Sequence, residues 1–464
     1  MNDVSRLSAD PTIRQHGFFL GHPIGFWFIF SGELAERASF YGMKAILTLY
    51  MIDKLGFTKA EATTRMSLFM AGAYFLPLVG GYVADRFFGK YWTIVGFSIP
   101  YILGHVILGV EDRWYLYTAL VLLAMGSGVI KPNISTLMGM TYDQQCPGQE
   151  KLRSAAFAIF YAAINIGAFA STTVMPELRD RFDYWVAFLF PAALMVFAFA
   201  FFAAGKRFYA VEVIRRTPIS PEERAEQWAV LRQLFGLFFL VMFFWAIFDQ
   251  HATTWIYFAR EHLDLHVFGY EVKPDQIQAI NPLLIVALLP VISALWTALE
   301  RGGVRLRATD KMTIGFLLTA LTMALHALAG YLAETGNTKV TVWWQIAAFV
   351  TITVAEIMIS VTGLELAFTA APARMKSFVT ACWLLTVGFA NLFLIAPVGR
   401  LYPDRSSPGW HFETTYGYFS MLTVALLVVT GAFVLVARRF NQVLKAGPRR
   451  DRVVESTLDT SVEA

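Results

Sequence analysis

The 464-residue sequence contains few charged residues and few cysteines for its length. Only 16% of the residues are charged and 56% are hydrophobic, whereas about 25% of an ordinary soluble domain is charged. A soluble fold cannot bury so much apolar surface. The two cysteines, Cys146 and Cys382, are too few for a disulfide framework or a cysteine metal cluster. The small formal charge of +4 gives no indication of nucleic-acid binding.

Long apolar runs fill most of the chain. About 20 apolar residues cross a bilayer as a helix, and breaks at charged residues, proline and glycine separate twelve such runs. The sequence therefore predicts an all-α membrane protein with twelve transmembrane helices. The first 22 residues contain no apolar run, which excludes a secretory signal peptide there. The expected spans lie near residues 24–52, 62–84, 91–110, 114–140, 154–176, 184–205, 231–258, 277–299, 312–333, 341–371, 378–399 and 414–437.

A polar stretch separates the first six expected spans from the last six. Its charged residues and paired prolines cannot lie in hydrocarbon, so it is interpreted as a surface linker. Lys and Arg residues are concentrated in the loops on the side of both chain ends, which places both termini in the cytoplasm. We expect a cytoplasmic tail, a six-helix bundle, a cytoplasmic linker, a second six-helix bundle and a second cytoplasmic tail at residues 1–22, 23–205, 206–230, 231–440 and 441–464.

The loop between the second and third spans carries a recognisable pattern. The stretch GGYVADRFFGK runs from Gly80 to Lys90 and resembles the loop signature of the major facilitator superfamily. Its glycines permit close helix approach, and Asp85 and Arg86 can pair with neighbouring helix ends. The resemblance implies two six-helix bundles that rock around a central cavity.

Some charged residues remain inside the expected spans after the loops are assigned. An ionised group in hydrocarbon costs on the order of 3 kcal/mol or more unless it meets a partner or a water-filled cavity. These residues are therefore the first candidates for a functional site, although Glu365 lies near a helix end that solvent can reach. The set comprises Glu33, Glu36, Arg37, Lys44, Lys131, Asp249, Glu356 and Glu365.

The first span is the most highly charged. Glu33 and Arg37 stand four residues apart with the acid first, which is the favourable order on a helix, and Glu36 lies beside them. A structural salt bridge would account for one carboxylate and one guanidinium. A second carboxylate favours a functional role, because it can take up and release a proton when its surroundings change.

Charges in later spans lie in positions that could face the first span. Lys131 needs a counter-charge or a ligand carboxylate if it is buried, and the alternative is that its amine reaches the membrane interface. Asp249 and Glu356 lie near the middle of spans in the second half. We expect a cavity with a cationic wall from the first half and an acidic wall from the second, which suits a zwitterion.

Histidines and aromatic residues give weaker signals. His105, His251 and His326 lie in spans and could titrate, but a lone histidine in a helix bundle is more often a hydrogen-bonded packing residue. Aromatic residues such as Tyr41 and Trp383 are at least as often packing or interface residues as pocket walls.

Several motifs in the spans occur in combination. Glu33-Leu-Ala-Glu36-Arg37 is followed by FYG, GSGVIKPNIS covers residues 126–135, and FAIFYAAINIGAF covers 157–169. FWAIFDQH lies in the seventh span, NPLL begins at Asn281, and EIMISVTGLELAFTAAPARMKS joins the tenth and eleventh spans. From about residue 24 to 401 the chain resembles the proton-dependent oligopeptide transporter family, also called the peptide transporter family.

The resemblance implies import of di- and tripeptides driven by a proton gradient. It implies that Arg37 and Lys131 hold the peptide carboxylate, and that Glu33, Glu36, Arg37, Lys131 and Asp249 take part in proton coupling. Lys44 and Asp249 are implied to form an outer gate. The implied substrate-binding residues are Arg37, Tyr41, Tyr74, Lys131, Asn165, Asn281, Glu356 and Trp383.

The sequence also departs from the family pattern. Phe40 stands where many members have tyrosine, and SVTG in the tenth span lacks the proline of many bacterial members. Ser67 occupies the region of the proton-handling histidine of animal members, so coupling through that histidine is not available. The linker leaves no room for the two extra spans of many bacterial members.

Two other functions were weighed against peptide symport. The same fold could carry another small solute, such as nitrate, an amino-acid derivative or a peptide-like drug, although an anion needs no acidic wall. A membrane-bound enzyme or receptor is disfavoured, because the loops contain no metal-ligand, phosphate-loop or nucleophile motif. We expect a multi-pass protein of the cell membrane that works as a monomer, with the proton as coupling ion and no cofactor.

Overall fold

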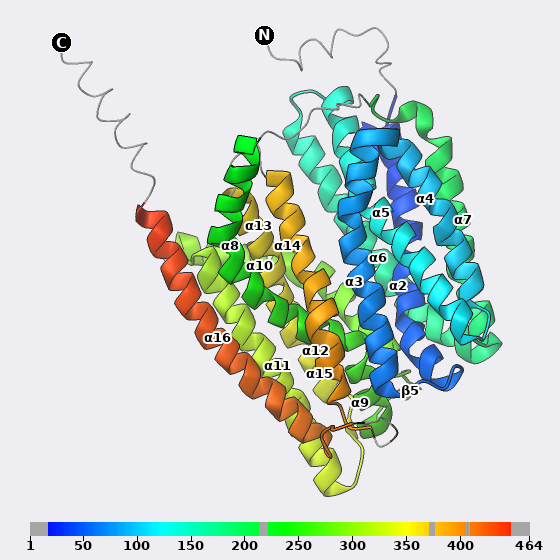
Figure 1. Cartoon of the computed structure of the whole chain (residues 1–464), viewed down its shortest axis with the longest axis vertical. Helices are drawn as coiled ribbons and strands as arrows, with labels where there is room; N and C mark the ends of the chain where they lie inside the picture. Colours follow the sequence, from blue (N-terminus) through cyan, green and yellow to red (C-terminus); the bar gives the residue numbers. More distant parts are fainter. Residues whose placement is uncertain (1–16, 213–220, 371–375, 405, 407–408, 447–464) are drawn as a thin grey trace, which may run out of the picture.

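The computed structural model describes residues 17–212, 221–370, 376–404, 406 and 409–446. Most of the two predicted tails, and residues 213–220 of the predicted linker, lie outside this part. The first half of the chain is a series of long helices (Figure 1): α2 Ile24–Asp53, α3 Lys59–Val83, α4 Gly89–Leu108, α5 Arg113–Gln145, α6 Glu150–Phe182 and α7 Tyr184–Ala204.

The second half contains more, and shorter, helical pieces. A 3-10 turn at Asp249–Ala252 joins α8 to α9, and single π-helical turns at Ile357–Val361 and Asn391–Ile395 join α12 to α13 and α14 to α15. A further π-helical turn, Ala84–Phe88, joins α3 to α4. The helices are α8 Pro221–Phe248, α9 Thr254–His262, α10 Ile280–Arg301, α11 Ala308–Gly336, α12 Trp343–Glu356, α13 Thr362–Ala370, α14 Lys376–Ala390, α15 Ala396–Arg400 and α16 Thr415–Ala446.

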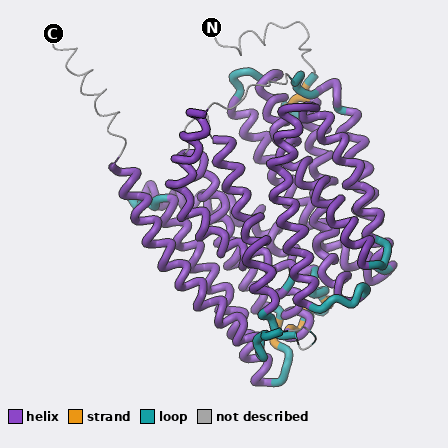
Figure 2. The backbone as a smooth tube through the Cα atoms, viewed as in Figure 1, coloured by secondary structure: helices purple, strands orange, loops and turns teal. Residues whose placement is uncertain are grey.

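The strands in the described chain are two-residue segments confined to the connections (Figure 2). β1 (Phe18–Phe19) pairs antiparallel with β2 (His22–Pro23), and β4 (His266–Val267) pairs antiparallel with β5 (Tyr270–Glu271). β3 (Leu263–Asp264) pairs parallel with β6 (Val340–Thr341). We call the end of the molecule where α2 begins and α16 ends the near end, and the opposite end, where α2 ends and α9 lies, the far end (Figure 1).

Each half of the chain has its own hydrophobic core. Buried side chains from Phe26 to Tyr209 form one cluster, and buried side chains from Leu234 to Phe440 form another. Ile52 and Tyr74 pack against both clusters. Helices α2–α7 accordingly gather beside α8–α16 (Figure 1), so the candidate residues of the two halves can meet only along the seam between them.

The described helices are suited to a bilayer. Ten stretches are long and apolar enough to cross a membrane, and one of them, Lys59–Leu108, contains both α3 and α4. Helix α2 has 30 residues but is not among the ten, because Glu33, Glu36, Arg37 and Lys44 recur along it. The chain is therefore an all-helical membrane protein with ten to twelve candidate spans.

Glycine permits close packing between the helices of the first half, as the sequence predicted for the Gly80–Lys90 stretch. A Cβ atom on Gly80 would lie only 2.7 Å from Val129 Cα of α5, whereas one on Gly81 would meet nothing within 4 Å. Asp85 forms an ion pair with Lys90 at 2.5 Å, at the start of α4. This pair tightens the turn between α3 and α4.

Candidate functional site

The charged residues of the first predicted span form one buried cluster on α2. Arg37 Nε lies 2.7 Å from Glu33 Oε1 and 2.7 Å from Glu36 Oε2. All three residues are 2% exposed. The helix itself brings them together, since residues four apart stand on the same face. Two carboxylates therefore share one guanidinium, as the sequence predicted.

Polar atoms of this cluster are left without hydrogen bonds. Glu33 Oε2 and Arg37 Nη2 are buried and make none within the described part of the chain. Tyr101 of α4 donates a hydrogen bond of 3.0 Å to Glu36 Oε1, a contact that the sequence did not predict. Leaving buried polar atoms unpaired costs roughly 1–3 kcal/mol each, and more when they are charged. The cluster thus retains capacity for a further polar group.

Lys131 of α5 lies next to this cluster rather than at an interface. Its Nζ is 4.9 Å from the ring centre of Phe40 and 5.0 Å from that of Tyr74. Its charge interacts with those of Glu33, Glu36 and Arg37. A cation held over two rings and close to carboxylates is retained inside the bundle, which favours the ligand-binding interpretation over snorkelling.

Asp249 and Glu356, the predicted site acids of the second half, each have a neutral amide partner. Asn281 of α10 donates a hydrogen bond of 2.8 Å to Glu356 Oε2 and one of 3.1 Å to Thr353 Oγ1. Asn391 donates one of 2.6 Å to Asp249 Oδ2. Glu356 directly precedes one π-helical turn and Asn391 begins another. Such turns are common at functional sites because they re-aim side chains.

The two sets of charges face one another across the seam without forming ion pairs. Lys44 interacts electrostatically with both Asp249 and Glu356, and Lys131 does so with Asp249. Tyr41 lies within electrostatic range of both Arg37 and Glu356. Among the described ion pairs none joins Lys44 to Asp249, so the pair implied by the resemblance is not closed in this structure.

Two other predicted site residues, Asn165 and Trp383, make contacts within their own halves. Asn165 is 8% exposed and bonds to the backbone of its own helix, at Tyr161 O, over 3.0 Å. Trp383 is enclosed in the second half, where it packs edge-on against Phe238 at 5.5 Å and directly against Gly363. These contacts of Trp383 lie within the second half and do not include the charged cluster of α2.

The intramembrane histidines have the hydrogen bonds of packing residues. His105 Nε2 and Ser39 Oγ are 2.8 Å apart. His251 donates to Phe248 O over 2.6 Å and His326 donates to Thr322 O over 3.0 Å. Glu365 is exposed, in keeping with its predicted position near a helix end.

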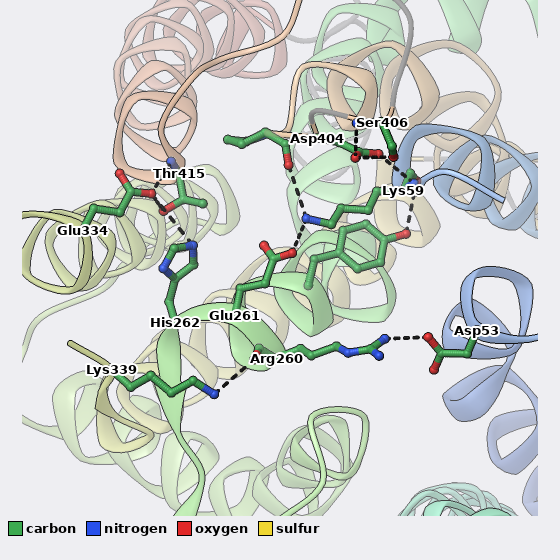
Figure 3. A network of polar contacts seen from close by, with 12 residues as sticks. Asp53, Lys59, Arg260, Glu261, His262, Glu334, Lys339, Asp404, Ser406 and Thr415 are labelled. Atoms are coloured by element: carbon green, nitrogen blue, oxygen red, sulfur yellow. Dashed lines mark hydrogen bonds and ion pairs between the residues drawn. The ribbon is translucent and has the colours of Figure 1, made fainter. Parts of the chain in front are cut away.

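A polar network that the sequence did not reveal closes the far end. Lys59 forms an ion pair with Glu261, and its main-chain N–H donates to Asp404 Oδ2 over 3.0 Å. Arg260 pairs with Asp53 at 2.7 Å (Figure 3). Lys59 and Arg260 lie between predicted spans, where charge is ordinary, so nothing in their sequence positions marked them as partners.

Further ion pairs at the far end join α6 of the first half to the segment that precedes α10. Arg179 of α6 forms an ion pair with Asp275, which precedes α10 and is fully buried. Burial raises the pKa of the Asp275 carboxyl to about 6, and the charge of Arg179 opposes that rise only in part. Lys273 pairs with Asp180 at 3.1 Å. In the described part of the chain, the hydrogen bonds and ion pairs between the two halves lie at this end or just beneath it.

The arrangement defines the class of the protein. Two helical halves meet along a seam with Arg37, Lys44 and Lys131 on one side and Asp249 and Glu356 on the other. Among the described residues, the polar contacts between the halves gather toward the far end. Among the described residues no group of His, Cys, Asp or Glu could hold a metal ion. The architecture is that of a multi-pass transporter of the major facilitator type.

Comparison with known proteins gives the family. The family model described as POT family matches residues 91–222 and 210–398. Peptide transporter family 1 of Drosophila melanogaster is 34% identical over 66% of this chain and 47% of its own. Dipeptide and tripeptide permease B of Aliivibrio fischeri is 27% identical over 93% of this chain and 97% of its own.

Solved structures agree with this assignment. The crystal structure of a peptide transporter POT in complex with sulfate matches with a TM-score of 0.83 and 25% identity, over 95% of this chain and 99% of that one. That of the POT family transporter PepTSo matches with a TM-score of 0.79 and 29% identity, over 90% and 99%. The chain belongs to the POT family, the proton-dependent oligopeptide transporters, which confirms the resemblance seen in the sequence.

The relatives differ in length. The chain spans about half the length of the first animal relative, 47%, and 97% of the length of the bacterial permease. Because the chain belongs to a family of transporters, it is a transporter and not an enzyme.

Proposed function

We propose that the protein imports di- and tripeptides together with protons by alternating access. In this proposal twelve spans form two six-helix bundles, at residues 23–205 and 231–440, joined by the linker 206–230. Both termini face the cytoplasm, the membrane is the plasma membrane, and the monomer is the working unit. The relatives named for peptide transport support the substrate class.

One observation carries the proposal: the buried Glu33–Glu36–Arg37 cluster has more carboxylate than it can pair. Arg37 Nη2 makes no hydrogen bond in the described chain and is a suitable donor to the carboxylate of a peptide, with Lys131 as second cation. On the opposite wall Glu356 and Asn281, together with Asn165 of α6 in the first half, would receive the peptide amino group. Tyr41, Tyr74 and Trp383 would contact peptide side chains.

Proton coupling follows from competition for Arg37. When a peptide carboxylate binds the guanidinium, Glu33 or Glu36 loses part of its counter-charge and can take up a proton. Neutral carboxyls then allow the halves to move, and release of peptide and proton restores the cluster. Lys44 and Asp249 would serve as the gate that forms and breaks during this cycle.

A second candidate keeps the fold and changes the solute. A POT family transporter with 26% identity and a TM-score of 0.80 has been crystallised in complex with 5-aminolevulinic acid. That amino-acid derivative carries an amine and a carboxylate, so it would satisfy the same two walls. Nitrate, which has no positive end, would leave Glu356 unmatched.

Transport in reconstituted vesicles tests the proposal. Labelled dialanine is supplied outside, with and without an inward proton gradient, and 5-aminolevulinic acid and nitrate are supplied in parallel. We expect accumulation of dialanine only with the gradient. A potential of 100 mV contributes about 2.3 kcal/mol for each charge moved. Gradient-driven accumulation of nitrate without dialanine would overturn the proposal.

Glu36→Gln tests the coupling step. We expect this variant to exchange labelled for unlabelled dialanine across the vesicle membrane and to lose accumulation driven by the proton gradient. The change removes a titrating group but keeps a hydrogen-bond acceptor for Tyr101. Glu300→Gln, at an exposed position at the end of α10, is the matched control. Unchanged gradient-driven accumulation in Glu36→Gln would contradict the coupling role.

A further inference from the structure

A small apolar groove lies at the near end, between the start of α2 and the last turn of α7. Its volume is about 290 Å³, and one side is open. The lining is apolar except for one hydroxyl, so neither a peptide nor a metal ion would find ligands there. The lining residues are Phe19, Ile24, Trp27, Phe28, Ser31 and Phe201.

Two cations stand at the rim of this groove. Lys206 Nζ lies 4.2 Å from the ring centre of Trp92, and Arg207 Cζ lies 4.7 Å from that of Phe208. Phe208 in turn stacks on Phe28, with ring centres 5.5 Å apart and planes at 12°. Since Phe28 lines the groove, the cations and the groove form one continuous surface.

The charges of these cations are not matched by a nearby carboxylate. Both side chains are exposed, and neither forms an ion pair within the described part of the chain. The acidic neighbour is Glu212, whose two oxygens accept hydrogen bonds from the backbone N–H groups of Lys90 and Tyr91 at 2.5 and 2.9 Å. Glu212 is therefore committed to the start of α4.

The groove lies at the ends of helices long and apolar enough to span a membrane, where we expect the membrane surface. From Ile24 to Ser31 the helix rises about 10 Å, so the groove begins where α2 begins and extends two turns inward. Phe19 and Trp92 are 58% and 56% exposed at the same level. Exposed aromatic residues at the ends of spans are typical of the boundary between headgroups and acyl chains.

We propose that this surface binds one anionic phospholipid, with an acyl chain in the groove and its phosphate on Lys206 and Arg207. Apolar walls and two unmatched cations at headgroup depth fit that chemistry, because basic pockets beside spans bind anionic headgroups. The bound lipid would lie over the place where the 206–208 turn packs on α2. There the carbonyl oxygen of Phe208 lies against Gly25. This site is independent of the proposed transport activity.

Quenching of Trp27 fluorescence measures occupancy of the groove directly. The full chain is reconstituted in phosphatidylcholine vesicles that contain increasing fractions of brominated phosphatidylglycerol. The Trp27 signal is taken as the difference between the chain and its Trp27→Phe variant, in which the other tryptophans are unchanged. We expect half-maximal quenching at a low fraction of the anionic lipid, and much weaker quenching by brominated phosphatidylcholine.

Two variants and a matched control separate the parts of the site. In Lys206→Gln/Arg207→Gln the half-quenching fraction should rise about thirtyfold, the equivalent of about 1 kcal/mol for each lost cation. In Ser31→Phe, which fills the groove, quenching by either lipid should fall. Arg301→Gln/Arg305→Gln removes two exposed cations of the second half and should behave as the unaltered chain.

Three results would overturn the proposal. Equal quenching by the brominated forms of both lipids would show an acyl contact without headgroup recognition. An equal loss in the Arg301→Gln/Arg305→Gln control would show a general effect of surface charge. Displacement by millimolar water-soluble glycerol phosphate, with no preference between lipids, would assign the cations to a soluble phosphate compound instead.

Discussion

Each charged residue inside a span raises the free energy of the protein unless a partner stabilises it, and the partners here differ in strength. Asp249 and Glu356 have amide partners, while Glu33 and Glu36 share Arg37. A shared partner is a weaker counterweight, because one Nε–H faces two carboxylates. The first-half cluster is therefore the place where protonation changes the local balance most.

The buried Asp275 should make the far end sensitive to acid. Its pKa is about 6 in the closed arrangement, against an ordinary 3.8, so the closed arrangement binds a proton more tightly than one in which Asp275 is in water. The ratio of closed to open molecules should thus rise as the pH falls through 6, and the rise should be complete near pH 4. Because one proton is taken up, the ratio should change by at most about tenfold per pH unit.

Spin labels at Trp114 and Phe268 can follow this closure. Both positions are exposed, 79% and 95%, and they lie in opposite halves at the far end. In a background without the two cysteines, the short-distance population should grow between pH 6 and 4. Asp275→Asn should remove this dependence, and Asp183→Asn, which affects an aspartate paired with Lys54 of its own half, should keep it. A pH-independent distance in the unaltered chain would refute the idea.

Residues with charge were predictable from the sequence, and their neutral partners were not. Arg37, Lys131 and Glu356 stand out because an ionised group inside an apolar run needs an explanation. Tyr101 and Asn391 carry no charge and occur in spans for many reasons, so their hydrogen bonds to Glu36 and Asp249 became visible only in three dimensions. For Trp383 the sequence left packing and pocket lining both open, and the structure encloses its side chain in the second half.

At the scale of helices, the close approach between α4 and α5 requires glycine at position 126 of α5. A Cβ on Gly126 would lie 2.2 Å from Tyr101 Cβ and 2.9 Å from its Cα, so backbone would have to move. We expect Gly126→Ala to lower the melting temperature of the protein in detergent and to disturb the Tyr101–Glu36 hydrogen bond.

Gly96→Ala on α4 is the matched control. A Cβ there would meet nothing within 4 Å, and alanine in a helix is favoured over glycine by roughly 0.5–1 kcal/mol. The control should therefore melt at the same temperature or slightly higher. Equal melting temperatures for both variants would contradict the proposed crossing.

Helices were predicted at the right places but not with the right ends. Hydropathy reports only the part of a helix that lies in hydrocarbon, and helices here continue beyond it. Helix α8 begins at Pro221, ten residues before the expected start at 231, since proline followed by two acidic residues is a helix-start pattern. The break at 357–361 contains no proline to announce it, whereas Pro397 follows the break at 391–395 and removes the hydrogen bond to the carbonyl of Phe393.

At the scale of the whole molecule, the far-end ion pairs should set how often that end opens. Lys59→Gln removes the pair with Glu261, which joins the two halves. We expect the Trp114–Phe268 distance distribution to shift toward longer values, by a population change of a few-fold, since exposed pairs contribute roughly 0.2–1 kcal/mol.

Lys54→Gln gives the matched comparison for that variant. Lys54 is also at the far end and pairs with Glu111 and Asp183, both of its own half. Its removal should leave the distance distribution unchanged. A shift of the same size in both variants would mean that general charge, and not the link between halves, governs opening.

Beneath these ion pairs lies a second layer of contacts that carries no charge. Thr48 Oγ1 donates to Ala252 O over 2.6 Å, and Gln278 Nε2 donates to Ala45 O over 3.4 Å. Neither bond titrates, and dissolved salt screens neither as it screens an ion pair. The contacts beside the charged cluster should therefore keep their strength when the salt concentration rises, while the ion pairs of the far end weaken.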